Sequence, residues 1–200
     1  MPRPDVSAER RTQILQAAVQ VFSKRGFANA RMDDIVQESG LSKGALYWYF
    51  KSKDEIITAL MEQFYGDYLD AAILDQPGTV TERLKVMLEQ IMGGASQSML
   101  LLPITLEFYA NVPRRADMGA FFQRMFAAYR DLLEQLLQQG VARGEFPQTT
   151  DPQQVAQALI GLFEGTAIIG LLQGQTADQI AQQLAAGTRL LLAGLKNLDE

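Results

Sequence analysis

Apolar residues recur along most of this chain at the three- and four-residue spacing of amphipathic helices. Sustained two-residue alternation is missing and β-branched residues are sparse, so the pattern predicts no strands. An all-α protein with about nine helices is therefore expected. The predicted helices span residues 8–25, 32–39, 43–50, 53–74, 81–96, 101–111, 115–143, 152–173 and 177–198.

Local signals mark where these helices begin. Capping boxes, in which serine or threonine stands three residues before glutamate or glutamine, start at Ser52, Thr79 and Thr176. Asp151 followed by Pro152 is a further start signal, because aspartate caps a helix and proline suits its first turn. Glycines and prolines between the predicted helices mark the stops.

The segment 32–50, with the sequence MDDIVQESGLSKGALYWYF, predicts two short helices joined by a tight turn. Gly40 stands where a left-handed residue can end the first helix. Ser42 can cap the second helix through its hydroxyl. Leu46 and Phe50 supply the inward face of the second helix, so this segment is expected to be a helix-turn-helix.

The outward face of the second short helix has an unusual composition. It carries Lys43, Gly44, Tyr47 and Trp48, with Tyr49 at its edge. Lysine and tyrosine can bond phosphates, and aromatic rings can pack on sugars and thymine methyl groups. The segment leaves open the alternative that these aromatic residues belong to a core or an interface. DNA binding is favoured because the turn chemistry and a basic flank agree with it.

Charge is unevenly distributed along the chain. The net charge is −5, yet residues 1–53 carry nine basic and five acidic residues, which leaves +4 there and −9 on the remainder. DNA affinity depends on local cations that displace counterions, so a basic head on an acidic body suits a DNA-binding protein. A chance fluctuation of surface charge is the alternative.

Histidine and cysteine are both absent. Disulfides, thiolate metal sites and nucleophile–histidine–acid triads are thereby excluded, and neither enzymatic activity nor a metal or cofactor is expected. An enzyme that uses Glu107 and Glu164 as paired carboxylates is the alternative. No targeting signal is visible and the uninterrupted apolar stretches are short, so a cytoplasmic protein that does not enter the membrane is expected.

The N-terminal part of the chain resembles the TetR family of one-component transcriptional repressors. The resemblance covers about residues 10–69 and is carried by residues 14–18, 22, 26–27, 32–35, 39–50, 53 and 56. It implies a DNA-binding domain over residues 10–69, with its recognition motif at about 32–51, and an effector-binding and dimerisation domain over residues 70–200. It also implies a homodimeric repressor that binds a palindromic double-stranded DNA operator and is released from it by a small molecule. This molecule is expected to be hydrophobic.

The predicted DNA contacts lie in and around the second short helix, and the resemblance supports Lys43, Tyr47, Trp48, Tyr49 and Lys53 among them. The full predicted set is Arg31, Ser42, Lys43, Gly44, Tyr47, Trp48, Tyr49 and Lys53. Lys53 would hold a phosphate, and its alternative is a solvated lysine. Arg31 stands where the family usually has a capping threonine or serine; it can contact phosphate but cannot cap. Together with Val36, which replaces a common small alanine, it is the one hint of an alternative, a dimeric ligand-binding or adaptor protein that no longer recognises DNA.

The body of the chain carries candidates for two further sites. The last two predicted helices contain several glycines, although glycine inside a helix costs about 1 kcal/mol relative to alanine. Close packing in a four-helix dimer interface would explain these glycines. The predicted dimer residues are Gly161, Gly165, Ile168, Leu184, Gly187 and Leu191, with packing inside one chain as the alternative. The predicted ligand residues are Glu107, Tyr109, Phe122, Met125, Phe126, Tyr129 and Glu164. The two acids lie in apolar runs and could receive a cation or a donor from a ligand, while the alternative for this set is a structural role.

Overall fold

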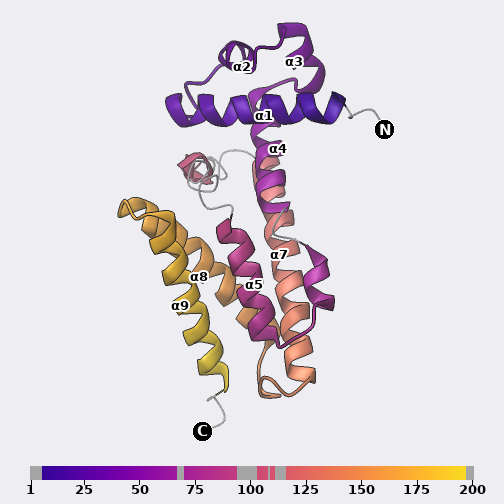
Figure 1. Ribbon diagram of the computed structural model, residues 1–200, viewed down its shortest axis with the longest axis vertical. Coiled ribbons are helices and arrows are strands. Elements are labelled where there is room, and N and C mark those ends of the chain that lie inside the picture. The colour runs from indigo at the N-terminus through magenta and orange to yellow at the C-terminus, as the bar shows by residue number, and fades with distance from the viewer. Residues whose placement is uncertain (1–5, 67–69, 94–102, 108, 111–115, 197–200) are drawn as a thin grey trace.

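The computed structural model describes residues 6–66, 70–93, 103–107, 109–110 and 116–196 (Figure 1). Within these ranges the chain forms helices and turns and no strand, which confirms the all-α prediction. The elements are α1 (Val6–Arg25), α2 (Met32–Ser39), α3 (Lys43–Tyr49), α4 (Lys53–Gly66), η1 (Ala71–Asp75), α5 (Val80–Gly93), α7 (Ala116–Ala142), α8 (Pro152–Leu172) and α9 (Ala177–Lys196). Residues 103–107 and 109–110 are also helical.

The three N-terminal helices form the head of the molecule. α1 lies across one end, and α2 and α3 cover its outer side (Figure 1). Ile14, Phe22, Ile35 and Leu46 are each at most 1 % exposed and form the core between these helices. Gly40 ends α2 with φ of 67°, a left-handed conformation that favours glycine because it has no Cβ.

Most of the predicted helix starts are present. The Ser42 hydroxyl accepts from the Ala45 N–H at 3.2 Å, and Asp151 accepts from the N–H groups of Gln153 and Gln154. At α2 the Arg31 side chain offers no acceptor, as expected. Asp34 compensates in part, because its carboxylate accepts from the Arg31 N–H at 2.9 Å. The helix therefore starts without the usual serine or threonine.

The predicted helix over residues 53–74 is too long. α4 ends at Gly66, and a separate 3-10 helix, η1, follows at Ala71–Asp75. Asp70 starts η1, because its carboxylate accepts from the Ala72 N–H at 2.9 Å. An aspartate that bonds a backbone N–H two residues ahead offers the chain an alternative to continuing a helix.

The body is built from α5, α7, α8 and α9. α7 packs against α8, α8 packs against α9, and α5 contacts both α7 and α9. Among the described helices, α8 is long and apolar enough to cross a membrane. This was not predicted from the sequence, because the uninterrupted apolar stretches are short. The core helix of a globular protein passes the same test, yet only 22 % of the apolar window of α8 is buried within this chain. Much of its apolar surface is therefore left uncovered by the single chain.

Candidate nucleic-acid interface and internal cavity

The aromatic residues of α3 are exposed to different extents. Trp48 is 69 % exposed, whereas Tyr47 and Tyr49 are half-buried and pack against the core. The rings of Trp48 and Tyr49 meet edge to face, with 4.6 Å between their centroids. The core alternative thus describes Tyr47 and Tyr49 in part, but Trp48 is open to solvent on a helix at the outer end of the molecule and is available to another molecule.

Lys43 and Gly44 lie at the start of α3. The Lys43 ammonium lies 2.8 Å from a carboxylate oxygen of Asp33, and this hydrogen bond and charge raise the pKa of Lys43. Both side chains are well exposed, and such surface pairs contribute little to stability. A phosphate can therefore replace Asp33 as the partner of Lys43. A Cβ added at Gly44 would meet nothing within 4 Å, so the backbone of α3 is open to close approach there.

Lys53, which was predicted to hold a phosphate, makes its hydrogen bonds within the chain. Its ammonium donates to the carbonyl oxygens of Phe27 at 2.7 Å, Ala28 at 3.0 Å and Ala30 at 3.1 Å. An ammonium has three donors, and all three are used here within the chain. Lys53 thus holds the turn between α1 and α2, and its phosphate contact stays a prediction.

Glu107 binds the backbone N–H groups of the same turn, whereas Lys53 binds its carbonyl oxygens. Its carboxylate oxygens accept from the N–H groups of Phe27 and Ala28, each at 2.8 Å. Glu107 thus binds the head and does not line the cavity described below, and its contact with a ligand stays a prediction. The local sequence could not indicate this role, since the bonded backbone lies about eighty residues earlier in the chain.

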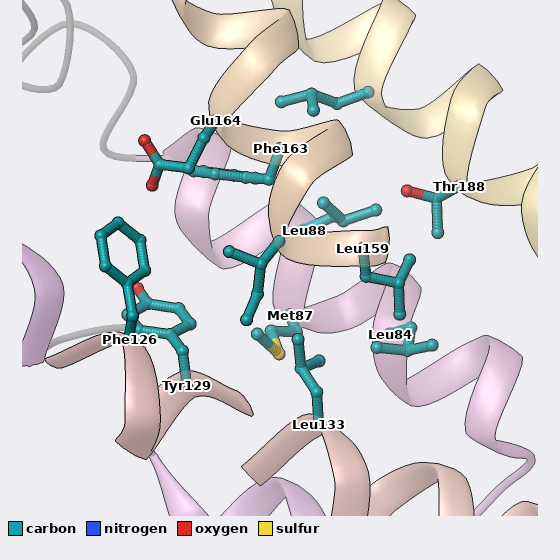
Figure 2. Close-up of a pocket in the computed structure, with 12 residues that line it drawn as sticks. Leu84, Met87, Leu88, Phe126, Tyr129, Leu133, Leu159, Phe163, Glu164 and Thr188 are labelled. Carbon is teal, nitrogen blue, oxygen red and sulfur yellow. The ribbon is translucent and has the colours of Figure 1, made fainter. Parts of the chain in front are cut away.

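A mainly apolar cavity lies among α5, α7, α8 and α9 (Figure 2). Its volume is about 50 Å³. It is lined by Leu84, Met87, Leu88, Phe126, Tyr129, Leu133, Leu159, Ile160, Phe163, Glu164, Leu184 and Thr188. Sites for drug-sized ligands usually measure about 300–1,000 Å³, so an organic ligand would have to displace lining side chains to enter.

Glu164 is the one acid among the residues that line this cavity. The hydroxyl of Tyr109 donates to its carboxylate at 3.0 Å. Figure 2 shows this carboxylate near the rings of Phe126 and Tyr129. Desolvation raises the pKa of Glu164, and the Tyr109 hydrogen bond opposes that shift.

The other predicted ligand residues stand one layer away from the cavity. The ring of Phe122 packs against those of Tyr109 and Phe126, with centroids 4.8 Å and 6.1 Å apart. Met125 is buried in the core and does not line the cavity. Of the predicted set, Phe126, Tyr129 and Glu164 thus face the cavity, while Tyr109 reaches it through Glu164.

Glu164→Gln is expected to flatten the pH dependence of stability. Because the pKa of Glu164 is raised in the fold, the native state binds more protons than the unfolded state from the ordinary value of 4.5 up to the raised pKa, and the free energy of unfolding falls as pH rises through that range. Glutamine keeps an acceptor for Tyr109 and carries no charge, so the variant should be more stable than the parent at pH 8. Chemical denaturation at several pH values measures this, and parallel curves for the two proteins would contradict it.

The predicted dimer residues divide into two groups. Leu184 is 2 % exposed and lines the cavity, so its side chain belongs to the core of its own chain and not to an outer face, which corrects the prediction. A Cβ at Gly187 would lie 2.9 Å from Leu162, so packing within the chain accounts for this glycine. In contrast, a Cβ at Gly161 or Gly165 would meet nothing within 4 Å.

The two carboxylates of the enzyme alternative do not form a pair. Glu107 binds the turn of the head, whereas Glu164 binds Tyr109 and faces the cavity. Among the residues that the structure describes, no group of three or more acidic side chains is placed to hold a metal ion.

Comparison with known proteins agrees with the helix-turn-helix and the helical body. Residues 14–60 match the family described as bacterial regulatory proteins, tetR family, and residues 80–193 match the C-terminal part of BetI-type transcriptional repressors. The transcriptional regulator SrpR of Pseudomonas putida is 30 % identical over 185 residues, which cover 87 % of this chain and 79 % of that protein.

Two solved structures share the fold. The fatty acid degradation regulator FadR of Bacillus halodurans has a TM-score of 0.78 at 24 % identity, covering 94 % of this chain and 96 % of its own. The regulator FadR of Bacillus subtilis, in complex with stearoyl-CoA, has a TM-score of 0.73 at 22 % identity, covering 92 % and 97 %. With both family matches spanning most of its length and an exposed helix-turn-helix at one end, the chain belongs to the TetR family of DNA-binding transcriptional regulators.

Proposed function

We propose that this regulator is a cytoplasmic homodimeric repressor that binds a palindromic operator and leaves it when a small, mainly apolar molecule binds. The open face of α3 is the observation that supports this most directly. Trp48 is 69 % exposed on a helix at the outer end of the molecule, and the same helix carries a lysine whose pKa is raised and a glycine with open space around it. An exposed indole on a helix that also carries a cation suits a groove lined by phosphates, sugars and thymine methyl groups.

We assign DNA contacts to residues 10–69, with α3 in the major groove. Lys43 and Arg31 would contact phosphates, and Trp48 and Tyr47 would pack on sugars and base edges. Ser42, Gly44 and Tyr49 would border the contact. Lys53 would contact a phosphate by giving up one of its three hydrogen bonds to the turn between α1 and α2.

Residues 70–200 would form the dimer and hold the effector. Ile169 and Leu172 of α8 and Leu190 of α9 are 54 %, 75 % and 74 % exposed, and only 22 % of the apolar window of α8 is buried. Two copies of α8 and α9 can cover each other in a four-helix interface with two-fold symmetry. A two-fold symmetric protein matches a palindromic operator, since each subunit places one recognition helix in one half-site.

Gly165→Leu is expected to convert the dimer to a monomer without unfolding the subunit. In the single chain a Cβ at Gly165 meets nothing described within 4 Å, so the larger side chain is expected to point away from the subunit and toward a second copy. Gly66→Leu is the matched control, because its Cβ position at the end of α4 is equally open. Analytical ultracentrifugation measures the mass of each variant. A dimeric Gly165→Leu variant would exclude this part of α8 from the interface.

The effector would enter the cavity around Glu164. The wall is apolar and Glu164 is its one acid, so a molecule with an apolar body and a positively charged or hydrogen-bond-donating group fits the chemistry. The stearoyl-CoA in the Bacillus subtilis FadR structure supports a long apolar ligand in this fold. Because the present cavity measures about 50 Å³, a ligand must move lining residues such as Met87 and Phe126. Binding would thus favour a different packing of the body helices, as relief of repression requires.

Fluorescence anisotropy tests the proposal on DNA from upstream of the protein's own gene and on a scrambled fragment, over a series of salt concentrations. Preference for the native fragment, with affinity that falls as salt rises, is expected. Octylamine and octanoate, which share one alkyl chain length, then test release, and octylamine is expected to be the stronger inducer. Absence of binding to either fragment at low salt would contradict the proposal and favour a dimeric adaptor that does not recognise DNA.

A further inference from the structure

The turn between α1 and α2, residues 26–30, is held by two side chains of opposite charge. Its N–H groups at Phe27 and Ala28 bind the Glu107 carboxylate, and its carbonyl oxygens at Phe27, Ala28 and Ala30 bind the Lys53 ammonium. Charge-assisted hydrogen bonds of this kind are about twice as strong as neutral ones. This turn leads directly into α2, so its position sets where the helix-turn-helix lies relative to the body.

The two anchors of this turn belong to different parts of the molecule. Lys53 is the first residue of α4, whereas Glu107 lies on the helical segment 103–107. Thr105 of the same segment is 1 % exposed and its hydroxyl lies 3.6 Å from the sulfur of Met61 on α4. Ile104 is also buried in the core. The segment is therefore packed against the core of the protein, and Glu107 extends from a segment that buried residues hold in place.

Tyr109 follows Glu107 by two residues, and both residues are helical. Their side chains contact different parts of the molecule. Glu107 accordingly binds the head, while Tyr109 donates to Glu164 in the cavity wall. Because the two residues are only two positions apart in the chain, a displacement of this segment alters both contacts at once.

We propose that Glu107 is the positioning residue through which the cavity controls the DNA-binding head, with the Tyr109–Glu164 hydrogen bond as its switch. While Tyr109 binds Glu164, the segment keeps the Glu107 carboxylate on the turn and the head in its DNA-binding position. A ligand whose donor or cation takes over Glu164 displaces the Tyr109 hydroxyl. The helical turn then shifts, and the Phe27 and Ala28 N–H groups lose their acceptor.

This inference rests on the proposed function and specifies how the cavity acts on DNA binding. It gives Glu164 a role that does not require the ligand to reach the head. It also accounts for a carboxylate in the cavity wall, because the acid serves as a shared acceptor for which the protein and the ligand compete. A ligand can shift the two states only by its different affinity for them, and competition for one acceptor supplies such a difference.

Operator binding and amide hydrogen exchange of three variants test the inference without any ligand. Tyr109→Phe removes the switch while leaving the head untouched, Glu107→Gln removes one of the two acceptors from the turn, and the double variant combines them. Each single variant is expected to lower operator affinity about tenfold, within the usual range of coupling between sites. Each is also expected to accelerate exchange of the Phe27 and Ala28 amides. The double variant should resemble Glu107→Gln alone, because the two residues act in series.

Thr150→Val is the matched control, because it removes a buried hydroxyl that lies outside both the cavity and the head, at nearly constant volume. It should leave operator affinity and the two amides as in the parent. Parent-like affinity and exchange in Tyr109→Phe would overturn the inference, as would strictly additive losses in the double variant. If the parent itself fails to bind any operator, the proposed function fails, whereas a parent that binds beside insensitive variants contradicts the coupling alone. Thermal unfolding of each variant identifies any loss of affinity that comes from unfolding.

Discussion

Trp48→Ala is expected to weaken operator binding by about 10- to 100-fold while leaving the free protein as stable as the parent, since one base-edge interaction is worth about 1–3 kcal/mol. The indole is 69 % exposed, so the folded chain does not depend on burying it. In a homodimer the substitution acts in both half-sites, which places the effect toward the upper end of the range. Anisotropy at one fixed salt concentration, together with thermal unfolding, measures both quantities.

Lys43→Ala separates two kinds of interaction on the same helix. A lysine on phosphate releases counterions, so its removal should reduce the slope of log affinity against log salt by about one for each phosphate that is no longer neutralised. Trp48→Ala should leave that slope unchanged, because an indole neutralises no phosphate. If Trp48→Ala binds the operator as tightly as the parent, the outer face of α3 does not dock on DNA and the assignment of the recognition helix is wrong.

Arg83→Ala is expected to lower the free energy of unfolding by about 2–4 kcal/mol, because it leaves both a cavity and unpaired acceptors. Arg83 is 1 % exposed. Its guanidinium donates to the Leu74 carbonyl at 3.0 Å, the Gln139 side-chain oxygen at 2.7 Å and the Gly78 carbonyl at 3.3 Å. One arginine thus joins η1 and the loop before α5 to α7. Urea denaturation monitored by circular dichroism measures the change.

Two further variants divide the expected loss at Arg83 into its causes. Arg83→Met keeps most of the volume and removes a charge whose desolvation is costly, so it should lose less stability than Arg83→Ala. Lys85→Ala is the surface control, since the side chain of Lys85 is 76 % exposed and its ion pair with Glu89 spans 3.7 Å. Such a change is expected to stay within about 0.5 kcal/mol. Equal stability of the alanine variants at positions 83 and 85 would contradict a role for Arg83 in the fold.

The local features of the head could be predicted from a few neighbouring residues. Gly40 has the left-handed backbone that a tight turn requires, and Ser42 caps α3 as expected. Trp48 was placed on the outer face by helical periodicity alone and is the exposed residue of the aromatic run. Where prediction failed locally, at residues 53–74, a competing aspartate cap at Asp70 had been overlooked.

The residues of the body were harder to predict, because periodicity identifies an apolar face and does not say what covers it. Leu184 and Leu190 are both apolar residues of α9, yet Leu184 is 2 % exposed and Leu190 is 74 % exposed. The sequence does not reveal which arginine is buried, because arginine is almost never fully buried unless it is paired, and its partners can lie far away in the chain. The burial of Arg83 depends on acceptors in Leu74, Gly78 and Gln139, which span two separate regions of the chain.

Short-range signals in the amino-acid sequence were enough to define the helices, the tight turn and the open aromatic face of α3, because each depends on residues within one or two helical turns. The roles of Lys53 and Glu107 emerged only once the chain was folded. The sequence suggests contacts with other molecules for both residues, and the fold places both on one turn of the head, from 23 to 80 residues away along the chain. A charged side chain binds whichever backbone groups the fold brings near it, and packing of the whole molecule brings residues 26–30 between these two.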